Sequence, residues 1–197
     1  FAAYRFARDR IADIQIARLE KDRRRRELAD SVPDTSRTWN RIFTPEEIRE
    51  RMTAFERNLS TMIELCQSRR VSIIIGTVPS NLLKPNLPGE AGARYQQALA
   101  LIHGGQREEG LRLARRILRE APRHQASDAE NEIIRAVAAR YRSPLADVEA
   151  AVIAAEPNGI AGETLFNDHC HLTPDGNRLL VAAYEREVRS LFGANAP

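Results

Sequence analysis

The stretch that most constrains the fold is VSIIIGTVPSNLL, which covers residues 71–83. Val71 to Ile75 is short and largely β-branched, a pattern typical of a strand buried in the middle of a parallel sheet. Gly76 to Asn81 then forms a polar loop at the carboxyl end of this strand, where open α/β sheets collect their ligand clefts. We therefore expect Thr77, Ser80 and Asn81 to line a cleft and to contact a substrate there.

A long helix is predicted directly before this strand. The tetrapeptide TPEE supplies Thr44 as the N-cap, Pro45 in the first turn and Glu47 to complete a capping box. Apolar residues then recur at steps of three and four, which predicts one buried stripe made of Ile48, Met52, Phe55, Leu59 and Ile63. Residues 1–29 also have a helical pattern, and residues 31–40 have the composition of a loop. A helix, a buried strand and a polar loop together favour a doubly wound α/β fold.

Residues 85–124 are predicted to form a helical insert of two helices joined at Gly104–Gly105. Their leucines and small residues resemble a single tetratricopeptide-type hairpin. Because one hairpin cannot bury its own apolar face, it must dock on the rest of the chain. It could act as a cap over the site, as a docking surface for a protein partner, or as an insertion without a substrate role.

Residues 125–197 complete the predicted organisation, in which residues 1–84 hold the N-terminal helices and central strand. A helix is expected over 127–141 and a brief strand at 145–148. Thr173 is expected to cap a last helix that Pro174 enters in its first turn. The inward stripe of that helix is predicted to comprise Leu180, Tyr184, Val188 and Leu191.

The charge pattern argues against a nucleic-acid-binding protein. The formal net charge is only +3, and aromatic residues make up 6% of the chain. The one dense basic run is KDRRRR at 21–26, which is typical of a solvated helix end, with a contact to an anionic membrane surface as the alternative. Nucleic-acid binders concentrate basic charge on one face with aromatic residues interleaved.

The chemistry-bearing residues gather in LFNDHCHLTPDGN, positions 165–177. Asp168, His169, Cys170 and His171 are all competent metal ligands. Adjacent residues point in diverging directions, however, whereas tetrahedral zinc sites draw their ligands from spaced pairs. We therefore predict no metal and no cofactor at this motif.

A catalytic Asp–His pair needs fewer of these residues to converge than a metal site does. Asp168 and His171 are three residues apart, so a tight turn can bring the carboxylate beside the imidazole. The carboxylate would fix the ring through one nitrogen and leave the other to take a proton from a serine hydroxyl. From the residues alone, an ordinary polar loop before a helix remains the simpler interpretation.

A resemblance favours the hydrolytic pair. NDHCHLTPDGNRLLVAAY (167–184) resembles the final block of the SGNH (GDSL-type) hydrolase superfamily, whose signature is D-x-x-H. IIIGTVPSNL (73–82) is similar to the fourth strand and loop of bacterial members with tetratricopeptide-like inserts. The resemblance spans roughly residues 44–192. It implies a three-layer α/β/α, flavodoxin-like fold with a parallel sheet, here incomplete, and a serine esterase that cleaves acyl esters of carbohydrate or lipid. Asp168 and His171 match the acid and base positions.

The chain departs from the family pattern at the nucleophile. It contains neither Gly-Asp-Ser nor Gly-x-Asn followed by Asp or Glu. No serine lies in the family's setting, and only Ser80 is predicted near a cleft; the serines are Ser31, Ser36, Ser60, Ser68, Ser72, Ser80, Ser127, Ser143 and Ser190. We therefore expect the nucleophile to come from outside this chain, which would be inactive alone.

Several expectations follow from that gap. Because the chain begins with Phe1 in helical sequence, we expect a piece of a longer protein, with the first strands upstream. Those strands, a second copy or another chain would cover the open sheet edge. An upstream signal or anchor would place the protein at a membrane or outside the cytoplasm. Two alternatives stay open: an acyltransferase with the same triad, and a non-catalytic binding module with a degenerate hydrolase fold.

Overall fold

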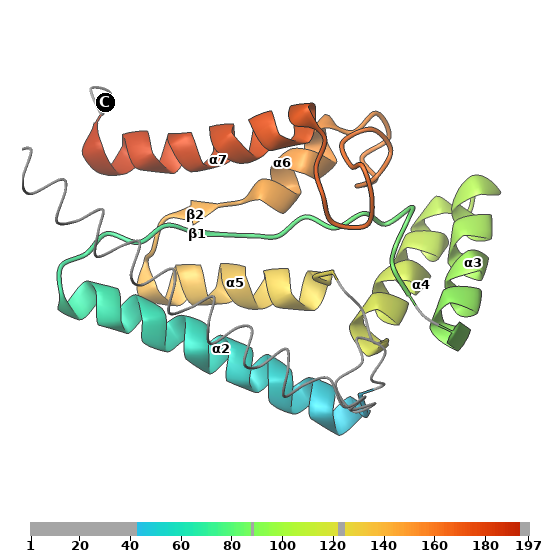
Figure 1. Cartoon of the computed structure of the whole chain (residues 1–197), viewed down its shortest axis with the longest axis horizontal. Coiled ribbons are helices and arrows are strands. Elements are labelled where there is room, and N and C mark those ends of the chain that lie inside the picture. Colours follow the sequence, from blue (N-terminus) through green and yellow to red (C-terminus); the bar gives the residue numbers. More distant parts are fainter. Residues whose placement is uncertain (1–42, 88, 122–124, 194–197) are drawn as a thin grey trace, which may run out of the picture. The chain divides into compact units, whose positions relative to one another are not determined.

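The computed structural model describes residues 43–87, 89–121 and 125–193, which belong to one compact unit spanning residues 42–197. Their elements, coloured along the chain in Figure 1, are α2 (Pro45–Ser68), β1 (Ile75–Gly76), α3 (Gly89–His103), α4 (Arg107–Glu120), α5 (Asp128–Tyr141), β2 (Leu145–Ala146), α6 (Val148–Ala155) and α7 (Pro174–Phe192). The helix predicted over 1–29, its basic run and the loop at 31–40 lie outside the described residues. Within the described part, no helix is both long and apolar enough to cross a bilayer.

Helix α2 begins as the sequence predicts. Thr44 accepts a hydrogen bond from the Glu47 amide at 3.2 Å, and Glu47 accepts one from the Thr44 amide at 2.8 Å. These two bonds form a capping box, which satisfies backbone donors that the first helical turn leaves free. The predicted stripe faces inward, with Ile63 fully buried and its other members half-buried.

The sheet consists of two short strands. β1 and β2 are parallel, with Ile75 opposite Leu145 and Gly76 opposite Ala146, and they form the only sheet among the described residues. The predicted three-layer α/β/α, flavodoxin-like fold is therefore wrong: the described chain has six helices and one two-stranded sheet. An apolar run shows that a segment is suited to a strand but not how many strands pair with it. Val71, the first residue of the predicted strand, is 54% exposed.

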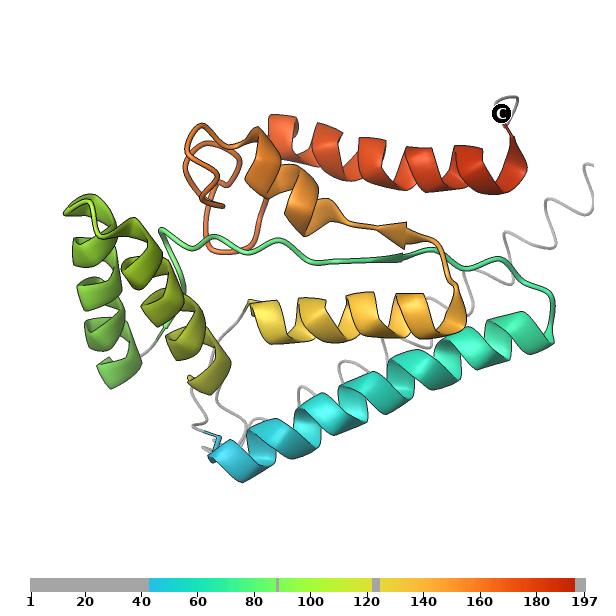
Figure 2. The same cartoon turned by 180° about the vertical axis from the view of Figure 1, so that it is seen from behind.

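Helices lie on both sides of the two strands. α2 and α5 lie on one side and α6 and α7 on the other, as Figures 1 and 2 show from opposite directions. The first side is closed by an apolar cluster from α2, β1 and α5 that contains Ile63, Ile75, Ile134, Val137 and Ala138. The second is closed by a cluster from β2, α6, α7 and the loop between these helices that contains Ala146, Val148, Val152, Ala161, Leu165, Phe166 and Ala183.

The last helix buries less of its stripe than predicted. Leu180, Tyr184 and Val188 are half-buried, but Leu191 is 38% exposed and Phe192 is 65% exposed. α7 contacts β2 and α6, and the apolar residues of its last turn are exposed. The prediction that Leu191 faces inward is therefore wrong.

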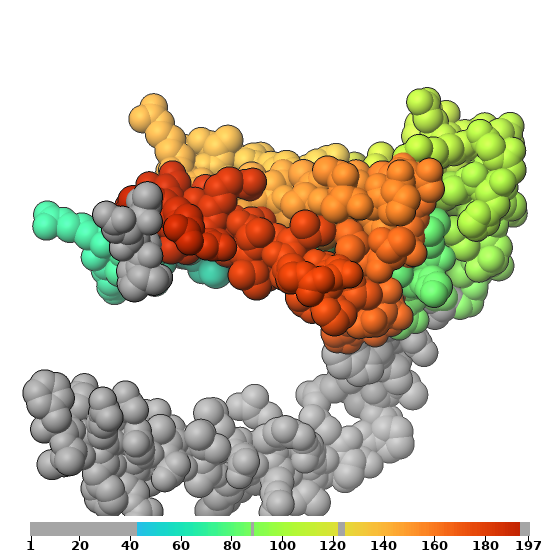
Figure 3. All heavy atoms as spheres, turned by 90° about the horizontal axis from the view of Figure 1, so that it is seen from above, coloured from blue at the N-terminus to red at the C-terminus, as the bar shows by residue number. Residues whose placement is uncertain are grey.

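Helices α3 and α4 form a hairpin joined at Gly104–Gly105, as expected. Tyr95, Ala98, Ala114, Ile117, Leu118 and Ala121 form its own apolar cluster. A Cβ on Gly110 would lie 2.7 Å from the Ala98 carbonyl oxygen, so only glycine permits this close crossing. The hairpin is tied to the rest of the unit by the Tyr95 hydroxyl, which donates to the Leu82 carbonyl at 2.8 Å, and by Arg107, which donates to the Asn158 carbonyl. Figure 3 shows the green hairpin beside the orange loop before α7.

Candidate functional site

The motif at 165–177 forms a closed turn directly before α7. Phe166 and Leu172 make an antiparallel bridge, and the Asn167 amide donates to the His171 carbonyl at 2.8 Å. Thr173 then caps α7, since its hydroxyl accepts from the Gly176 amide at 3.3 Å. The bridge and the helix cap fix both ends of the segment that carries Asp168 and His171.

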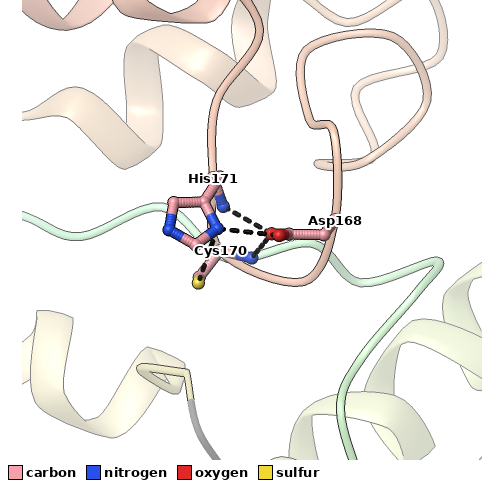
Figure 4. Close-up of side chains that lie close together, drawn as sticks. All are labelled: Asp168, Cys170 and His171. Atoms are coloured by element: carbon pink, nitrogen blue, oxygen red, sulfur yellow. Dashed lines mark hydrogen bonds and ion pairs between the residues drawn. The ribbon is translucent and has the colours of Figure 1, made fainter.

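Asp168 organises the inside of this turn (Figure 4). Its Oδ1 accepts hydrogen bonds from the Cys170 amide at 2.9 Å and the His171 amide at 2.8 Å. Its Oδ2 lies 2.7 Å from Nδ1 of the His171 ring. The two amides, followed by the His171 ring, hold the pKa of Asp168 well below its usual range. The side chain is therefore an ionised acceptor, which favours the imidazole tautomer with its proton on Nδ1.

The His171 ring combines a fixed nitrogen with an accessible one. Its side chain is 74% exposed, compared with 46% for Asp168. Nδ1 faces the carboxylate, and Nε2 forms no hydrogen bond to any described residue. In the Nδ1-protonated tautomer, Nε2 carries a lone pair that can accept a proton. The pair therefore has the geometry of an oriented general base.

Asn81 is fully buried and holds the turn through hydrogen bonds. Its Nδ2 donates to the Asp168 carbonyl at 2.8 Å, and its backbone amide donates to the His169 carbonyl at 3.1 Å. Its Oδ1 accepts from the Leu83 and Lys84 amides, both at 2.9 Å. All polar groups of this side chain have protein partners, so Asn81 links the segment after β1 to the Asp168–His171 turn.

Thr77 and Ser80 are hydrogen-bonded elsewhere. The Thr77 hydroxyl donates to Asp147 Oδ1 at 2.8 Å and accepts from the Glu149 amide at 2.9 Å. The Ser80 hydroxyl donates to the Ala126 carbonyl at 2.8 Å. Both side chains are buried. The structure thus joins Asn81 to the pair but gives Thr77 and Ser80 other partners, and a substrate contact for these three residues stays a prediction.

Sequence reasoning missed the residues that shape the loop between α6 and the turn. Glu156 is buried and accepts from the Gly162 amide at 3.0 Å, the Thr164 amide and hydroxyl at 2.8 Å each, and the Leu165 amide at 3.2 Å. Gly162 has φ +113°, and a Cβ there would collide with the Asn81 side chain. The sequence EPNGIAGET (156–164) contains a signal for this loop, since one glutamate is followed by two glycines. Such a loop needs a side chain that accepts hydrogen bonds from backbone amides and residues that can adopt a positive φ.

Among the described residues, no hydroxyl or thiol is hydrogen-bonded to Nε2 of His171. Cys170 Sγ lies 3.7 Å from Nδ1 of His171, the nitrogen that faces Asp168, so Nε2 cannot deprotonate it in this arrangement. Burial, followed by the charge of Asp168, raises the pKa of the Cys170 thiol. Among the described serines, none hydrogen-bonds to the His171 ring. Ser31 and Ser36 lie outside the described residues.

The turn brings metal-ligating atoms together, although the adjacent positions of these residues predict that their side chains diverge. Ligand atoms of Asp168, Cys170 and His171 all lie within 4.8 Å of one another. The backbone folds around the Asp168 carboxylate, so side chains at nearly adjacent positions converge instead of diverging. The sequence signal for this convergence is the aspartate itself, because Asp side chains commonly accept hydrogen bonds from backbone amides a few residues further along and so close a turn.

Comparisons with known proteins do not assign the chain to a family. No family model matches this chain, and no curated protein matches it. A functional assignment therefore has to rest on the chemistry of the Asp168–His171 turn and on its sequence resemblance.

Proposed function

We propose that Asp168 and His171 are the acid and base of a hydrolase that cleaves acyl esters through a hydroxyl nucleophile. The observation that carries this proposal is the 2.7 Å contact between Asp168 Oδ2 and His171 Nδ1. This contact leaves Nε2 free, and the ring that carries it is largely exposed. A carboxylate that holds one ring nitrogen while the other stays free is the arrangement that general-base catalysis in a triad requires.

In this mechanism, His171 Nε2 takes the proton of the nucleophilic hydroxyl as its oxygen attacks the acyl carbon. The Asp168 carboxylate stabilises the imidazolium that forms. When the tetrahedral intermediate collapses, Nε2 gives its proton to the leaving alkoxide and an acyl-enzyme remains. Water then attacks the acyl carbon with His171 as base again, which releases the carboxylic acid and restores the hydroxyl.

The resemblance of residues 167–184 to the last block of SGNH hydrolases supports the same chemistry. It also supports the choice of acyl esters of carbohydrate or lipid as the substrate class. The nucleophile in this proposal is a hydroxyl that lies outside residues 43–87, 89–121 and 125–193.

The proposal is tested by assaying the natural protein that contains this chain with short-chain p-nitrophenyl esters. His171→Ala is expected to lower kcat/KM by about 10³-fold or more, because it removes the base. Asp168→Asn is expected to lower it by about 10²–10⁴-fold, because an amide can stabilise the wrong ring tautomer. A fluorophosphonate probe should label one hydroxyl, and mass spectrometry of the labelled peptide identifies it.

His169→Ala is the matched control, since His169 lies two residues from His171 and its Nδ1 is 3.9 Å from Asp168 Oδ1. It should leave kcat/KM unchanged. Near-normal turnover in His171→Ala would remove His171 from the mechanism. A wild-type protein that neither hydrolyses these esters nor reacts with the probe would contradict the hydrolase itself.

A further inference from the structure

We propose that Asp168, Cys170 and His171 form a binding site for a thiophilic divalent cation such as Zn²⁺. The metal-bound turn and the Asp168–His171 hydrogen bond are alternative states of the same side chains. The three residues offer one oxygen, one sulfur and one nitrogen ligand within 4.8 Å of one another (Figure 4). The metal site does not depend on the hydrolase proposal.

The distances fit a single ion after small side-chain movements. With Zn–S of about 2.3 Å and Zn–N of about 2.0 Å, a tetrahedral site separates sulfur and nitrogen ligands by about 3.5 Å. Cys170 Sγ and His171 Nδ1 are 3.7 Å apart. Asp168 Oδ2 and Nδ1 are 2.7 Å apart, which is hydrogen-bond distance, and they must separate by about half an ångström around an ion.

The side chains can rearrange around an ion while the backbone hydrogen bonds of the turn are kept. Asp168 uses Oδ1 for the Cys170 and His171 amides and Oδ2 for the ring. Only the Oδ2 contact has to open, so the two amide bonds can continue to hold the turn. The His171 ring is 74% exposed and can rotate, and Cys170 Sγ already lies beside that ring.

Charge and ligand type select the class of ion. An Asp carboxylate and a Cys thiolate together neutralise a divalent cation, and the imidazole adds a neutral donor. A thiolate favours zinc, cobalt and related ions over magnesium or calcium, which prefer oxygen ligands. Three protein ligands leave a fourth position open for water.

Binding moves two protons. The Cys170 thiol releases its proton to solvent, and the proton on His171 Nδ1 is replaced by one on Nε2, so the ring remains neutral. The net release is one proton for each ion bound. Because binding releases this proton, affinity should increase as the pH rises.

One consequence rests on the proposed function. In the metal-bound state Nε2 carries a proton and cannot act as a base, so Zn²⁺ should inhibit ester hydrolysis and a chelator should reverse the inhibition. Binding is measured without substrate, so a failed metal site and a failed hydrolase can be told apart.

The test is a Co²⁺ titration of the reduced chain, followed by absorbance. Wild type should show a thiolate-to-cobalt charge-transfer band in the near ultraviolet together with intense visible bands of tetrahedral cobalt, and Zn²⁺ should abolish both. Cys170→Ser should lose the charge-transfer band. His171→Ala removes one ligand and Asp168→Asn removes the negative charge of another, so each should weaken binding by about tenfold or more. Proton release of one per ion is measured by calorimetry in two buffers.

Cys66→Ser is the matched control, because Cys66 is the other cysteine and lies on α2. It should keep the band and the affinity, and His169→Ala should keep them as well. Circular dichroism checks that each variant folds. A wild-type titration without the charge-transfer band, or a band that survives in Cys170→Ser, would overturn the site.

Discussion

At the scale of single residues, the Asp168 carboxylate has three roles. It closes the turn through two backbone amides, orients His171 and supplies a candidate metal ligand. The D-x-x-H spacing allows Asp168 to pair with His171, but it took the family resemblance to prefer this pairing to an ordinary polar loop. The spacing was not enough to predict where Cys170 points, because that depends on amide hydrogen bonds that only the folded turn shows.

Asn81 offers a test of what a buried amide contributes to the site. Asn81→Ala leaves the Asp168 carbonyl and the Leu83 and Lys84 amides without their partner. Because buried polar groups without partners are costly, we expect the free energy of unfolding to fall by about 2–4 kcal/mol in urea denaturation. The turn at 167–171 should loosen at the same time.

Asn86→Ala is the control for this change, since Asn86 is exposed and only five residues further along. Its unfolding midpoint should stay at the wild-type value. The result also separates two roles for Asn81. An unchanged stability with a raised KM would favour the substrate contact predicted from the sequence over the supporting role that its hydrogen bonds indicate.

At the scale of elements, the helix starts were the easiest features to predict. Thr44 with Glu47, and Thr173 with Pro174, are local signals, and both helices begin where these residues place them. The strand was harder, because pairing is a tertiary property. Val71 to Ile75 is suited to a strand, but the ladder of the described residues covers only Ile75 and Gly76.

An ion-pair network joins α5 and α6 to the residues that directly follow β1 and β2. Arg135 donates to Asp147 at 2.8 Å and to Glu149 at 2.7 Å, and Thr77 donates to Asp147 at 2.8 Å. The Arg135 hydrogen bond, ahead of the smaller contributions of the Ala150 amide and Thr77, lowers the pKa of Asp147 to about 2. The ionised carboxylate therefore stabilises the fold.

Asp147→Asn tests this network through its pH dependence. An aspartate whose pKa is depressed in the folded state stabilises the fold above its unfolded pKa of about 3.9 and loses that contribution as the pH falls toward 2. We expect the variant to be less stable by about 1–2 kcal/mol at neutral pH, with the partial exposure of the pair taken into account. The difference should shrink as the pH falls from about 5 to about 3.

Glu185→Gln provides the comparison. Glu185 pairs with Arg189 at 2.6 Å on the surface of α7, and its side chain is 51% exposed. Such exposed pairs contribute little, so this variant should stay near wild-type stability at every pH. Urea denaturation at several pH values measures both variants, and a constant gap between wild type and Asp147→Asn would contradict the proposed linkage.

At the scale of the whole described unit, segments distant in sequence meet at one turn. The segment after β1 supplies Asn81, the loop after α6 supplies Glu156 and Gly162, and the start of α7 holds the other end. The sequence predicts the two groups of site residues separately, and it does not show that Asn81 contacts the Asp168–His171 turn. The expected three-layer fold with an incomplete parallel sheet was wrong, because the apolar run and the resemblance both favoured an architecture that the described residues do not have.

The central claim is that Asp168 holds His171 with its proton on Nδ1 and leaves Nε2 free. Ring nitrogen chemical shifts and one-bond couplings of ¹⁵N-labelled histidine measure this directly, at a pH well above the ordinary histidine pKa and with metal ions removed. The structure predicts a protonated Nδ1 for His171 in wild type and a shift toward the Nε2-protonated form in Asp168→Asn. A wild-type ring with its proton mainly on Nε2 would contradict the claim.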